Sequence, residues 1–472
     1  MADLTLTRKS ARELARLIRE RAVSPVEVLD AHLAAIACIN PKLNAIITLA
    51  AGSAREAARA AEVALMKGEP LGLLLGLPVA IKDITPTAGI RTTYASSLYK
   101  NHVPAEDAEV VRRLKAAGAI VLAKTNTPEF AAGAFTDNAL FGPTRNPWNP
   151  ALSPAGSSGG SAVAVATGMV PLAQGTDFGG SIRVPAAFCG IVGIRPTPGL
   201  IPNHPMPLAW DPGQVHGPLA RDAEDAALML DAMVGFSPLS PISVPPPWPS
   251  ARAAIAQRDP GRLRLAYVSD IAGLGVEAEI EAICRSAALD LSGANADVEE
   301  IAFSAADGRA PYQTWRGIWM VGQQYARLAE IDRLGPNLRV NIQAGMKLTA
   351  RDIAAAEAIR QEVYHRFRML FERYDALLMP AAPVKPFAVE RQFPEAINGR
   401  TFESYIDWVA PAFLITLVGL PAASAPAGLT QDGLPVGMQI VAQRFAEPLI
   451  LRIAALVHAR GGVGWPSVAA ET

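Results

Sequence analysis

Residues 156–199 have the sequence GSSGGSAVAVATGMVPLAQGTDFGGSIRVPAAFCGIVGIRPTPG, and this stretch decides the fold class. Two loops rich in glycine and serine alternate there with short apolar segments. Residues 161–167 favour a helix of small side chains, while residues 170–173 and 191–194 favour short strands. Helices that alternate with apolar strands are typical of a sheet covered by helices. The stretch therefore predicts an α/β fold.

The same alternation extends to both sides of this stretch. Residues 73–81 are apolar and end at Lys82, which predicts a buried strand whose end reaches a functional edge. Residues 119–123 predict a second buried strand, after a helix and a glycine. Near the other end of the chain, residues 422–425 and 436–441 flank an Asp-Gly pair and predict a hairpin.

The length of the chain leaves the number of domains open. At roughly 100–200 residues per domain several would fit, but one large α/β domain is equally allowed, and we expect a single domain over residues 1–472. A proline cluster at residues 237–250 indicates a linker or a surface crossing. The segment from about 245 to 405 predicts a helix-rich subregion, with long helices over residues 312–331 and 349–374.

Composition excludes several classes of function. The 43 Lys and Arg residues nearly balance the 44 Asp and Glu residues, so we expect no electrostatic affinity for nucleic acid or for an anionic membrane. Long uncharged stretches at residues 151–176 and 408–431 are interrupted by prolines, so neither predicts a membrane-spanning helix. The N-terminus shows no apolar signal segment, and the three cysteines are scattered, so we expect a cytoplasmic protein.

Several common catalytic motifs are absent from the sequence. It contains no Walker-type phosphate loop, no HExxH zinc motif and no GxSxG nucleophile elbow. The six histidines are scattered; His216, just before a Gly-Pro pair, is the least easily dismissed. The sequence implies neither a metal nor an organic cofactor.

The two glycine–serine loops are the candidate functional site. They span residues 156–161 and 175–183, and both are embedded in apolar sequence that does not have the composition of a linker. Glycine allows close approach of the backbone and lets several N–H groups point at one spot, as an oxyanion hole requires. The first loop leads into a helix, whose dipole adds to that field. The pattern indicates a catalytic or anion-binding role.

The run over residues 156–199 resembles the signature of the amidase signature family, whose members are serine hydrolases of amides. Five further motifs resemble the family in the same order: 76–83 (GLPVAIKD), 124–130 (KTNTPEF), 142–148 (GPTRNPW), 217–221 (GPLAR) and 433–437 (GLPVG). The resemblance covers essentially the whole chain and is weakest between about 240 and 400. It implies a central, mixed, twisted β-sheet covered on both faces by α-helices.

The resemblance also implies a catalytic triad. Ser181 matches the nucleophile, Ser157 matches a bridging serine that follows a cis peptide bond, and Lys82 matches the base. The oxyanion hole would be formed by the backbone N–H groups of Phe178, Gly179, Gly180 and Ser181. Residues that would support the loops are Ser158, Asp177 and Arg183.

This chemistry is consistent with the residue types. A serine hydroxyl needs a base within hydrogen-bond reach, and a lysine acts as a base only when it is neutral. Burial near apolar strand residues would lower the pKa of Lys82 by disfavouring the ammonium form. Ser157 would then relay protons between Ser181 and Lys82, first during attack and later to the leaving amine. Water would hydrolyse the resulting acyl-enzyme.

The substrate is less well defined by the sequence. Aromatic and apolar residues in the variable segments suggest a hydrophobic or aryl amide. The substrate-binding candidates are Phe130, Met206, Trp210, Trp315 and Trp319. Further aromatic candidates are Tyr94, Phe135, Tyr312, Tyr405, Trp408 and Phe413. Aryl carbamates and esters are alternative substrates, because they share the same acyl chemistry.

Two other classes of protein remain open at this point. One is the amidase subunit of a glutamine-dependent amidotransferase, which would need protein partners and a polar pocket shaped for glutamine. The other is a non-catalytic descendant used for binding, and the occupied triad positions argue against it. A homodimer is implied only by the resemblance to the family.

Overall fold

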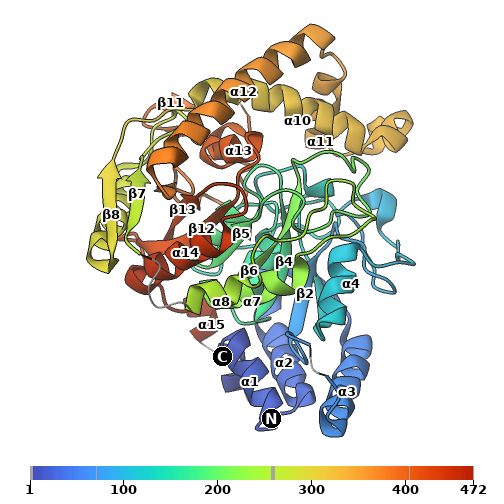
Figure 1. Ribbon diagram of the computed structural model, residues 1–472. Coiled ribbons are helices and arrows are strands. Elements are labelled where there is room, and N and C mark those ends of the chain that lie inside the picture. Colours follow the sequence, from blue (N-terminus) through green and yellow to red (C-terminus); the bar gives the residue numbers. More distant parts are fainter. Residues whose placement is uncertain (1–3, 71, 257–260, 403, 471–472) are drawn as a thin grey trace.

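A large mixed β-sheet forms the centre of the molecule (Figure 1). The computed structural model describes residues 4–70, 72–256, 261–402 and 404–470, and eleven strands of these residues form the sheet in the order β1-β3-β2-β4-β6-β5-β12-β13-β9-β7-β8. Their bounds are β1 Ile46–Leu49, β2 Pro78–Lys82, β3 Ile120–Thr125, β4 Leu172–Asp177, β5 Val192–Arg195, β6 Val215–Ala220, β7 Leu263–Tyr267, β8 Ala296–Glu300, β9 Ala376–Pro380, β12 Ala422–Leu429 and β13 Pro435–Val441. A separate small hairpin pairs β10 (Ala396–Ile397) with β11 (Arg400–Thr401).

The pairing directions make the sheet mixed. Strand β2 is parallel to both β3 and β4, and β7 is parallel to both β8 and β9. The strands between these two groups pair in antiparallel fashion, including the hairpin of β12 and β13. The mixed α/β sheet implied by the sequence is therefore confirmed.

Helices pack on both faces of this sheet. The α-helices are α1 Ala11–Arg19, α2 Pro25–Leu43, α3 Ala51–Lys67, α4 Glu109–Ala116, α5 Gly159–Ala166, α6 Arg183–Cys189, α7 Ala223–Met233, α8 Ala251–Ala256, α9 Ala278–Leu289, α10 Arg309–Gln323, α11 Pro336–Gly345, α12 Ala350–Arg373, α13 Ala410–Leu417, α14 Glu447–Gly461 and α15 Ser467–Ala470. The 3-10 segments are η1 Leu4–Arg8, η2 Ser97–Tyr99, η3 Glu129–Ala131, η4 Asp290–Ala294, η5 Ala306–Gly308, η6 Tyr325–Arg333 and η7 Asp407–Val409.

Alternating side chains of β2 show how the sheet orients the site. Val79 and Ile81 pack into a core with residues of α1, α7 and α14, on one face of the sheet. Ala80 packs on the opposite face, in a core with residues of α2, α5 and α6. Because side chains alternate along a strand, Lys82 lies on the same face as Ala80. The amine of Lys82 is therefore directed toward the loop that precedes α5.

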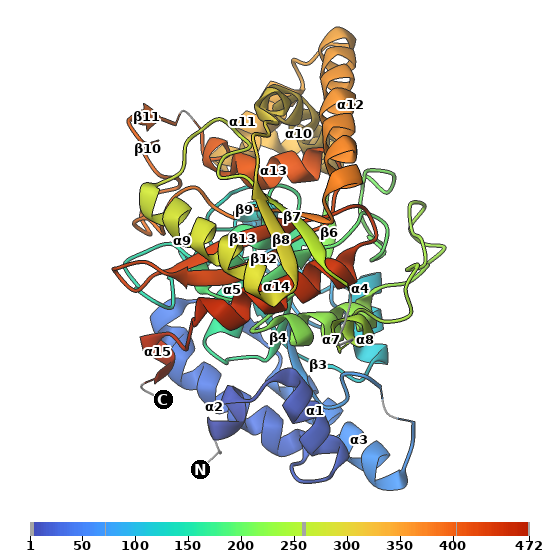
Figure 2. The ribbon, with the colours of Figure 1, turned by 60° about the vertical axis from the view of Figure 1, so that its left-hand side comes forward.

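A third core lies over the other half of the sheet. It joins residues of β7, β9 and β13 with residues of α10, α12 and α13, which gather at one end of the molecule in Figures 1 and 2. The segment from about 245 to 405 contributes β7, β8 and β9 to the sheet in addition to its helices. The extent of a single domain over residues 1–472 stays a prediction, and its first and last residues lie outside the described ones.

Two of the predicted elements are shorter in the structure than the sequence suggested. The strand expected over residues 73–81 is formed only from Pro78 to Lys82, because Gly76 adopts a positive φ of 75° and turns the chain before it. The helix expected over residues 312–331 ends at Gln323 and is followed by the 3-10 segment η6. Arg327 of η6 stacks on Tyr99 and Phe130, so tertiary contacts outweigh the helical propensity of this segment.

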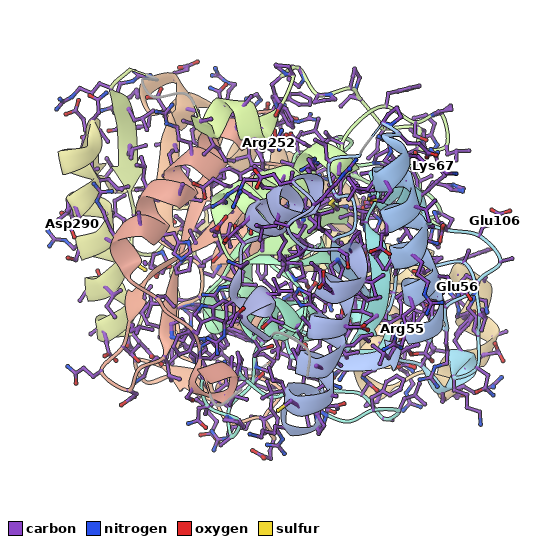
Figure 3. The ribbon with its side chains drawn as sticks, turned by 90° about the horizontal axis from the view of Figure 1, so that it is seen from below. Arg55, Glu56, Lys67, Glu106, Arg252 and Asp290 are labelled. Carbon is purple, nitrogen blue, oxygen red and sulfur yellow. The ribbon has the colours of Figure 1, made fainter. Side chains whose placement is uncertain are left out.

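Other predicted elements are confirmed, including the long helix α12 and the hairpin of β12 and β13. The described residues include no helix that is both long and apolar enough to cross a membrane. The N-terminal helices present charges of both signs to solvent: Arg55, Glu56 and Lys67 project from α3 in Figure 3. The three cysteines are free thiols.

Candidate active site

Lys82 ends β2 in a fully buried position. Its Nζ atom lies 2.6 Å from Ser157 Oγ, 2.9 Å from Ser158 Oγ and 3.0 Å from Thr176 Oγ1. The amine thus has three hydroxyl partners, all within hydrogen-bond distance. Two of them come from the loop before α5 and one from the end of β4, so the two glycine–serine loops meet at Lys82.

The surroundings of this amine favour its neutral form. Burial lowers the pKa of Lys82 well below its usual value, and the distant charge of Asp177 opposes this only in part. A neutral amine keeps a lone pair that can accept a proton from a hydroxyl. The arrangement therefore makes Lys82 a potential base for Ser157.

The loop before α5 has the backbone that the resemblance implied. The peptide bond between Gly156 and Ser157 is cis. Gly156 is packed so closely that a Cβ atom there would lie 2.3 Å from the carbonyl oxygen of Phe135. The backbone N–H of Ser158 donates to the carbonyl oxygen of Ser181 at 3.1 Å, which ties the first loop to the second.

Ser181 lies between β4 and α6, in a sharp turn that Gly180 makes with a φ of 101°. It lines a narrow cavity of about 30 Å³ together with Ser157, Thr176 and Gly179. The Ser181 hydroxyl has no hydrogen-bond partner among the residues that the structure describes, and its neighbour Ser157 is held by Lys82. The Ser181 side chain is therefore free to act on a molecule in this cavity.

The backbone N–H groups near Ser181 differ in their availability. The N–H of Gly180 donates to Asp177 Oδ1 at 2.9 Å, so the prediction that Gly180 offers a free donor is wrong. The Asp177 carboxylate occupies this N–H as part of the support of the turn. The N–H groups of Phe178, Gly179 and Ser181 have no acceptor within the described part of the chain, and all three residues line the narrow cavity.

A buried ion pair supports the turn. Arg183 donates from Nε and Nη2 to the two carboxylate oxygens of Asp177, at 3.0 and 2.9 Å. Burial alone would raise the pKa of Asp177, but the charges and hydrogen bonds of Arg183, helped by Arg195, hold it well below its usual range. Arg183 also donates to Gln439 Oε1 at 2.6 Å. The pair thus connects the turn to β13.

His216 has a supporting place beside the site. Gln174 donates from Nε2 to His216 Nδ1 at 2.9 Å, while its Oε1 accepts the backbone N–H of Lys82 at 3.2 Å. Burial, and secondly the charge of Lys82, lowers the pKa of His216 to about 4. The imidazole is therefore neutral near pH 7, and it is not among the hydrogen-bond partners of the Lys82 amine.

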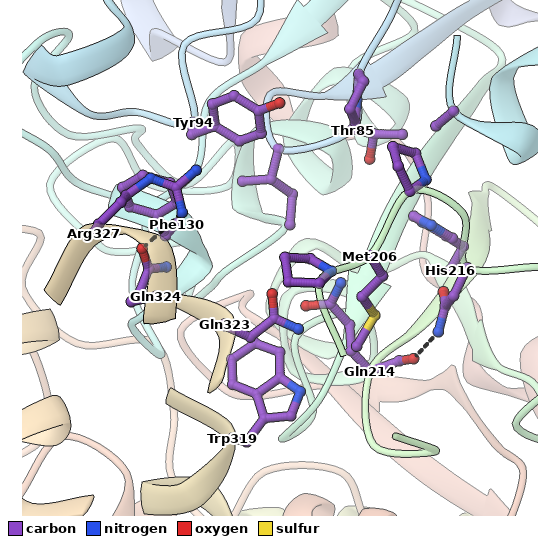
Figure 4. A pocket seen from close by; sticks show the side chains of 16 residues that line it. Thr85, Tyr94, Phe130, Met206, Gln214, His216, Trp319, Gln323, Gln324 and Arg327 are labelled. Carbon is purple, nitrogen blue, oxygen red and sulfur yellow. Dashed lines mark hydrogen bonds between the residues drawn. The ribbon is translucent and has the colours of Figure 1, made fainter. Parts of the chain in front are cut away.

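The site has a second, larger cavity of about 270 Å³, whose lining residues are drawn in Figure 4. Gln214 and Trp319 line both cavities, so the two are neighbours. The apolar walls of the larger cavity include Tyr94, Phe130 and Met206. On one side Arg327 lies against the Phe130 ring and Gln324 (Figure 4).

Only some of the substrate-binding candidates line these cavities. Phe130, Met206 and Trp319 do. The prediction for Trp210 is wrong, because its loop crosses the surface and its side chain is 76% exposed. The prediction for Trp315 is also wrong, because this ring packs behind Phe178 at 5.2 Å between centroids, outside the cavity walls.

The further aromatic candidates divide in the same way. Tyr94 lines the larger cavity, and Tyr312 and Tyr405 line the narrow one. Trp408 and Phe413 are buried in the core. Phe135 borders a separate cavity beside η3 and α11.

Sequence reasoning missed three residues of the site. Thr176 is the third partner of Lys82 and was visible within the second glycine–serine loop. Gln214 and Arg316 line the narrow cavity, but neither belongs to a recognisable motif. In the described parts of the chain, no group of His, Cys, Asp or Glu side chains could hold a metal ion.

Comparison with known proteins identifies the family. The family model described as Amidase matches residues 27–451. The chain belongs to the amidase signature family. The crystal structure of a bacterial aryl acylamidase of this family superposes on this amidase with a TM-score of 0.91 and 30% identity, covering 98% of this chain and 99% of that one.

Relatives of two kinds are similar to this amidase over nearly their whole length. An acylamidase of Rhodococcus erythropolis is 34% identical, covering 96% of each chain. One subunit of the glutamyl-tRNA(Gln) amidotransferase of Moorella thermoacetica is 35% identical, covering 94% of this chain and 95% of that one. The family makes this amidase a hydrolase acting on amides, but the identities do not distinguish these two kinds of relative.

Proposed function

We propose that this protein hydrolyses the C–N bond of a linear carboxylic amide with Ser181 as nucleophile, Ser157 as proton relay and Lys82 as base. The observation that carries this proposal is the 2.6 Å hydrogen bond between the Ser157 hydroxyl and a fully buried lysine amine. A base held in this way can activate a serine hydroxyl without a histidine.

The reaction begins when Ser181 Oγ attacks the amide carbonyl. Its proton passes to Ser157, which passes its own proton to Lys82. The oxyanion of the tetrahedral intermediate accepts hydrogen bonds from the N–H groups of Phe178, Gly179 and Ser181. As the C–N bond breaks, Lys82 returns the proton through Ser157 to the leaving amine, and an acyl-enzyme on Ser181 remains.

Hydrolysis of the acyl-enzyme repeats the relay in the same direction. A water molecule attacks the ester carbonyl while Ser157 takes its proton and Lys82 again acts as base. The acid product leaves when the bond to Ser181 Oγ breaks and Ser181 recovers its proton. Ser158, Asp177 and Arg183 touch none of the reacting atoms in this scheme; they hold the two loops in position.

The substrate we propose carries a hydrophobic or aryl group. Tyr94, Phe130, Met206 and Trp319 provide apolar surface in the larger cavity, where an aryl group could pack. Polar side chains share these walls: Asn203, Gln214, Gln323, Gln324 and Arg327. The likeness to an aryl acylamidase and to an acylamidase supports the same class. Aryl carbamates and esters stay alternative substrates, because the same nucleophile and relay would cleave them.

The amidotransferase alternative needs a site for glutamine, whose α-ammonium group requires an acidic or carbonyl partner. Among the described residues, the walls of the two cavities include no Asp or Glu side chain. Amide side chains supply carbonyl oxygens there: Asn203, Gln214, Gln323 and Gln324 line the larger cavity. The relative from Moorella thermoacetica keeps the alternative open, and its name marks it as part of a larger enzyme.

A panel of substrates tests the proposal. The purified chain is assayed on short aliphatic amides, anilides, an aryl carbamate and glutamine, each in parallel with Ser181→Ala. We expect turnover of the anilides that is lost in the variant. Turnover of glutamine alone would favour the amidotransferase alternative, and anilide turnover that survives in Ser181→Ala would refute the assignment of the nucleophile.

A further inference from the structure

Arg316 is a buried cation in the wall of the narrow cavity. It lies on α10, is 3% exposed, and lines the cavity together with Ser157 and Ser181. Its guanidinium donates to Asn341 and to the Tyr405 hydroxyl, and it stacks over the Tyr405 ring at 5.2 Å. These contacts fix the orientation of the guanidinium and leave some of its N–H donors unused.

Among the described residues, the charge of Arg316 has no carboxylate as counter-charge. No carboxylate among the described residues lies within ion-pair distance of its guanidinium, and its two hydrogen-bond partners are neutral. Arg183, which is also buried, is matched by the carboxylate of Asp177. A buried charge is costly unless it is paired, so an unmatched arginine in a cavity wall favours an anionic ligand.

The walls of the narrow cavity strengthen this argument. Besides Arg316, the described residues that line it are neutral: hydroxyl, amide, aromatic and small apolar side chains. The cavity therefore carries one positive charge close to Ser181. Arginine binds carboxylates with paired N–H donors, which gives both affinity and orientation.

We propose that Arg316 binds a carboxylate of the substrate, so that the physiological substrate is an amide with an anionic carboxylate near the scissile bond. This inference rests on the proposed amidase function and narrows its substrate class. Arg316 and Ser181 line the same narrow cavity, so a short link joins the carboxylate to the reacting carbonyl. The apolar part of the substrate then extends past Gln214 and Trp319 into the larger cavity.

Two kinds of molecule share this chemistry. In a mono-amide of a short dicarboxylic acid the carboxylate belongs to the acyl group, whereas in an N-acyl amino acid it belongs to the amine. Matched pairs distinguish them: the mono-anilide of succinic acid against butyranilide, and N-benzoylglycine against N-ethylbenzamide. Each pair keeps the apolar group and differs chiefly in the carboxylate.

The test measures the ratio of kcat/KM within each pair. For the native protein we expect the anionic member of one pair to exceed the neutral member by about tenfold or more, as expected for a charge-assisted hydrogen bond. Arg316→Met should bring this ratio to about one, and Arg316→Lys should retain part of it. A purely structural role of Arg316 would change both members of a pair equally, and that outcome would overturn the inference, as would the absence of a preference in both pairs.

A binding measurement separates this inference from the proposed function. Two proteins are titrated calorimetrically with succinic mono-anilide and with N-benzoylglycine. One carries Ser181→Ala alone, and the other carries Ser181→Ala together with Arg316→Met. We expect one of the two ligands to lose about tenfold or more in affinity with Arg316→Met. Equal affinities would overturn the role of Arg316 even if amides are hydrolysed, whereas a loss of affinity without any turnover would refute the proposed hydrolysis alone.

Discussion

At the scale of single residues, the partners of the buried Lys82 amine bear on its chemistry. Three hydroxyl groups surround its amine, where a structural lysine would commonly have a carboxylate. Burial without direct ion pairing lowers the pKa of Lys82, which fits the role of base that we propose for its amine. The sequence identified Lys82 through its motif, but only packing shows that the amine is sealed from water.

The pH dependence of activity follows from this lowered pKa. Protonation of Lys82 removes the base, so kcat/KM should fall as the pH drops through the lowered pKa and should rise to a plateau above it. Lys82→Ala should lose activity by a factor of about 10²–10⁴, and its remaining activity should lack this ascending limb. Initial rates on an anilide over a range of pH measure both the ascending limb and the loss of activity. An activity of Lys82→Ala equal to that of the native protein would refute the assignment of Lys82 as the base.

The buried pair of Asp177 and Arg183 has a predicted effect on stability. Asp177→Asn should lower the free energy of unfolding by about 3–5 kcal/mol, because the buried Arg183 then lacks its counter-charge. Asp297→Asn is the matched control, because Asp297 pairs with Arg262 in an exposed position. Urea unfolding of the three proteins measures the difference, and equal midpoints would show that the buried pair does not support the turn.

At the scale of elements, the sequence predicted those whose signals are local. The strand that ends at Lys82, the capped helix α12 and the hairpin of β12 and β13 follow from apolar runs, a capping box and an Asp-Gly turn. The break after α10 could not be predicted in this way. Residues of η6 are held by contacts with Tyr99 and Phe130, which lie more than 190 residues earlier in the chain.

Glycines within helices provide a test of close packing at α5. A Cβ atom at Gly160 of α5 would lie 2.5 Å from the backbone nitrogen of Asn126, whereas one at Gly52 of α3 would meet nothing within 4 Å. Gly160→Ala should therefore destabilise the protein and impair activity, because α5 must move away from β3. Gly52→Ala should raise the free energy of unfolding by about 0.5 kcal/mol through helix propensity. Thermal unfolding compares the Gly160→Ala and Gly52→Ala variants. A stable, fully active Gly160→Ala variant would contradict the close packing of α5 against Asn126.

At the scale of the whole molecule, the cavities are built from segments that are far apart in the sequence. Phe130 follows β3, Met206 precedes β6, and Trp319 and Arg316 lie on α10. The positions of the proposed triad belong to motifs that the sequence shows, but the walls of the cavities depend on how α10 packs over the sheet. For this reason the sequence alone placed Trp210 and Trp315 wrongly and missed Arg316.

Trp319 lines both cavities, so its removal should affect large substrates most. Trp319→Ala should lower kcat/KM for an anilide by about tenfold or more, because apolar contact with the aryl group is lost, and should affect a short aliphatic amide less. Trp210→Ala, at an exposed position outside both cavities, should change neither value. Steady-state kinetics measures kcat/KM for both substrates in each variant. An equal loss of kcat/KM for the anilide and the aliphatic amide in Trp319→Ala would argue against Trp319 as a wall of the substrate site.

The central claim is that Ser181 becomes acylated with the help of Ser157 and Lys82. Intact-protein mass spectrometry of samples quenched during turnover of an anilide tests it most directly, with peptide mapping to locate any adduct. We predict a mass increase equal to that of the acyl group, on the peptide that contains Ser181, and its absence in Ser181→Ala. An adduct that persists in Ser181→Ala, or anilide turnover with no adduct under conditions that trap acyl-enzymes, would contradict the mechanism.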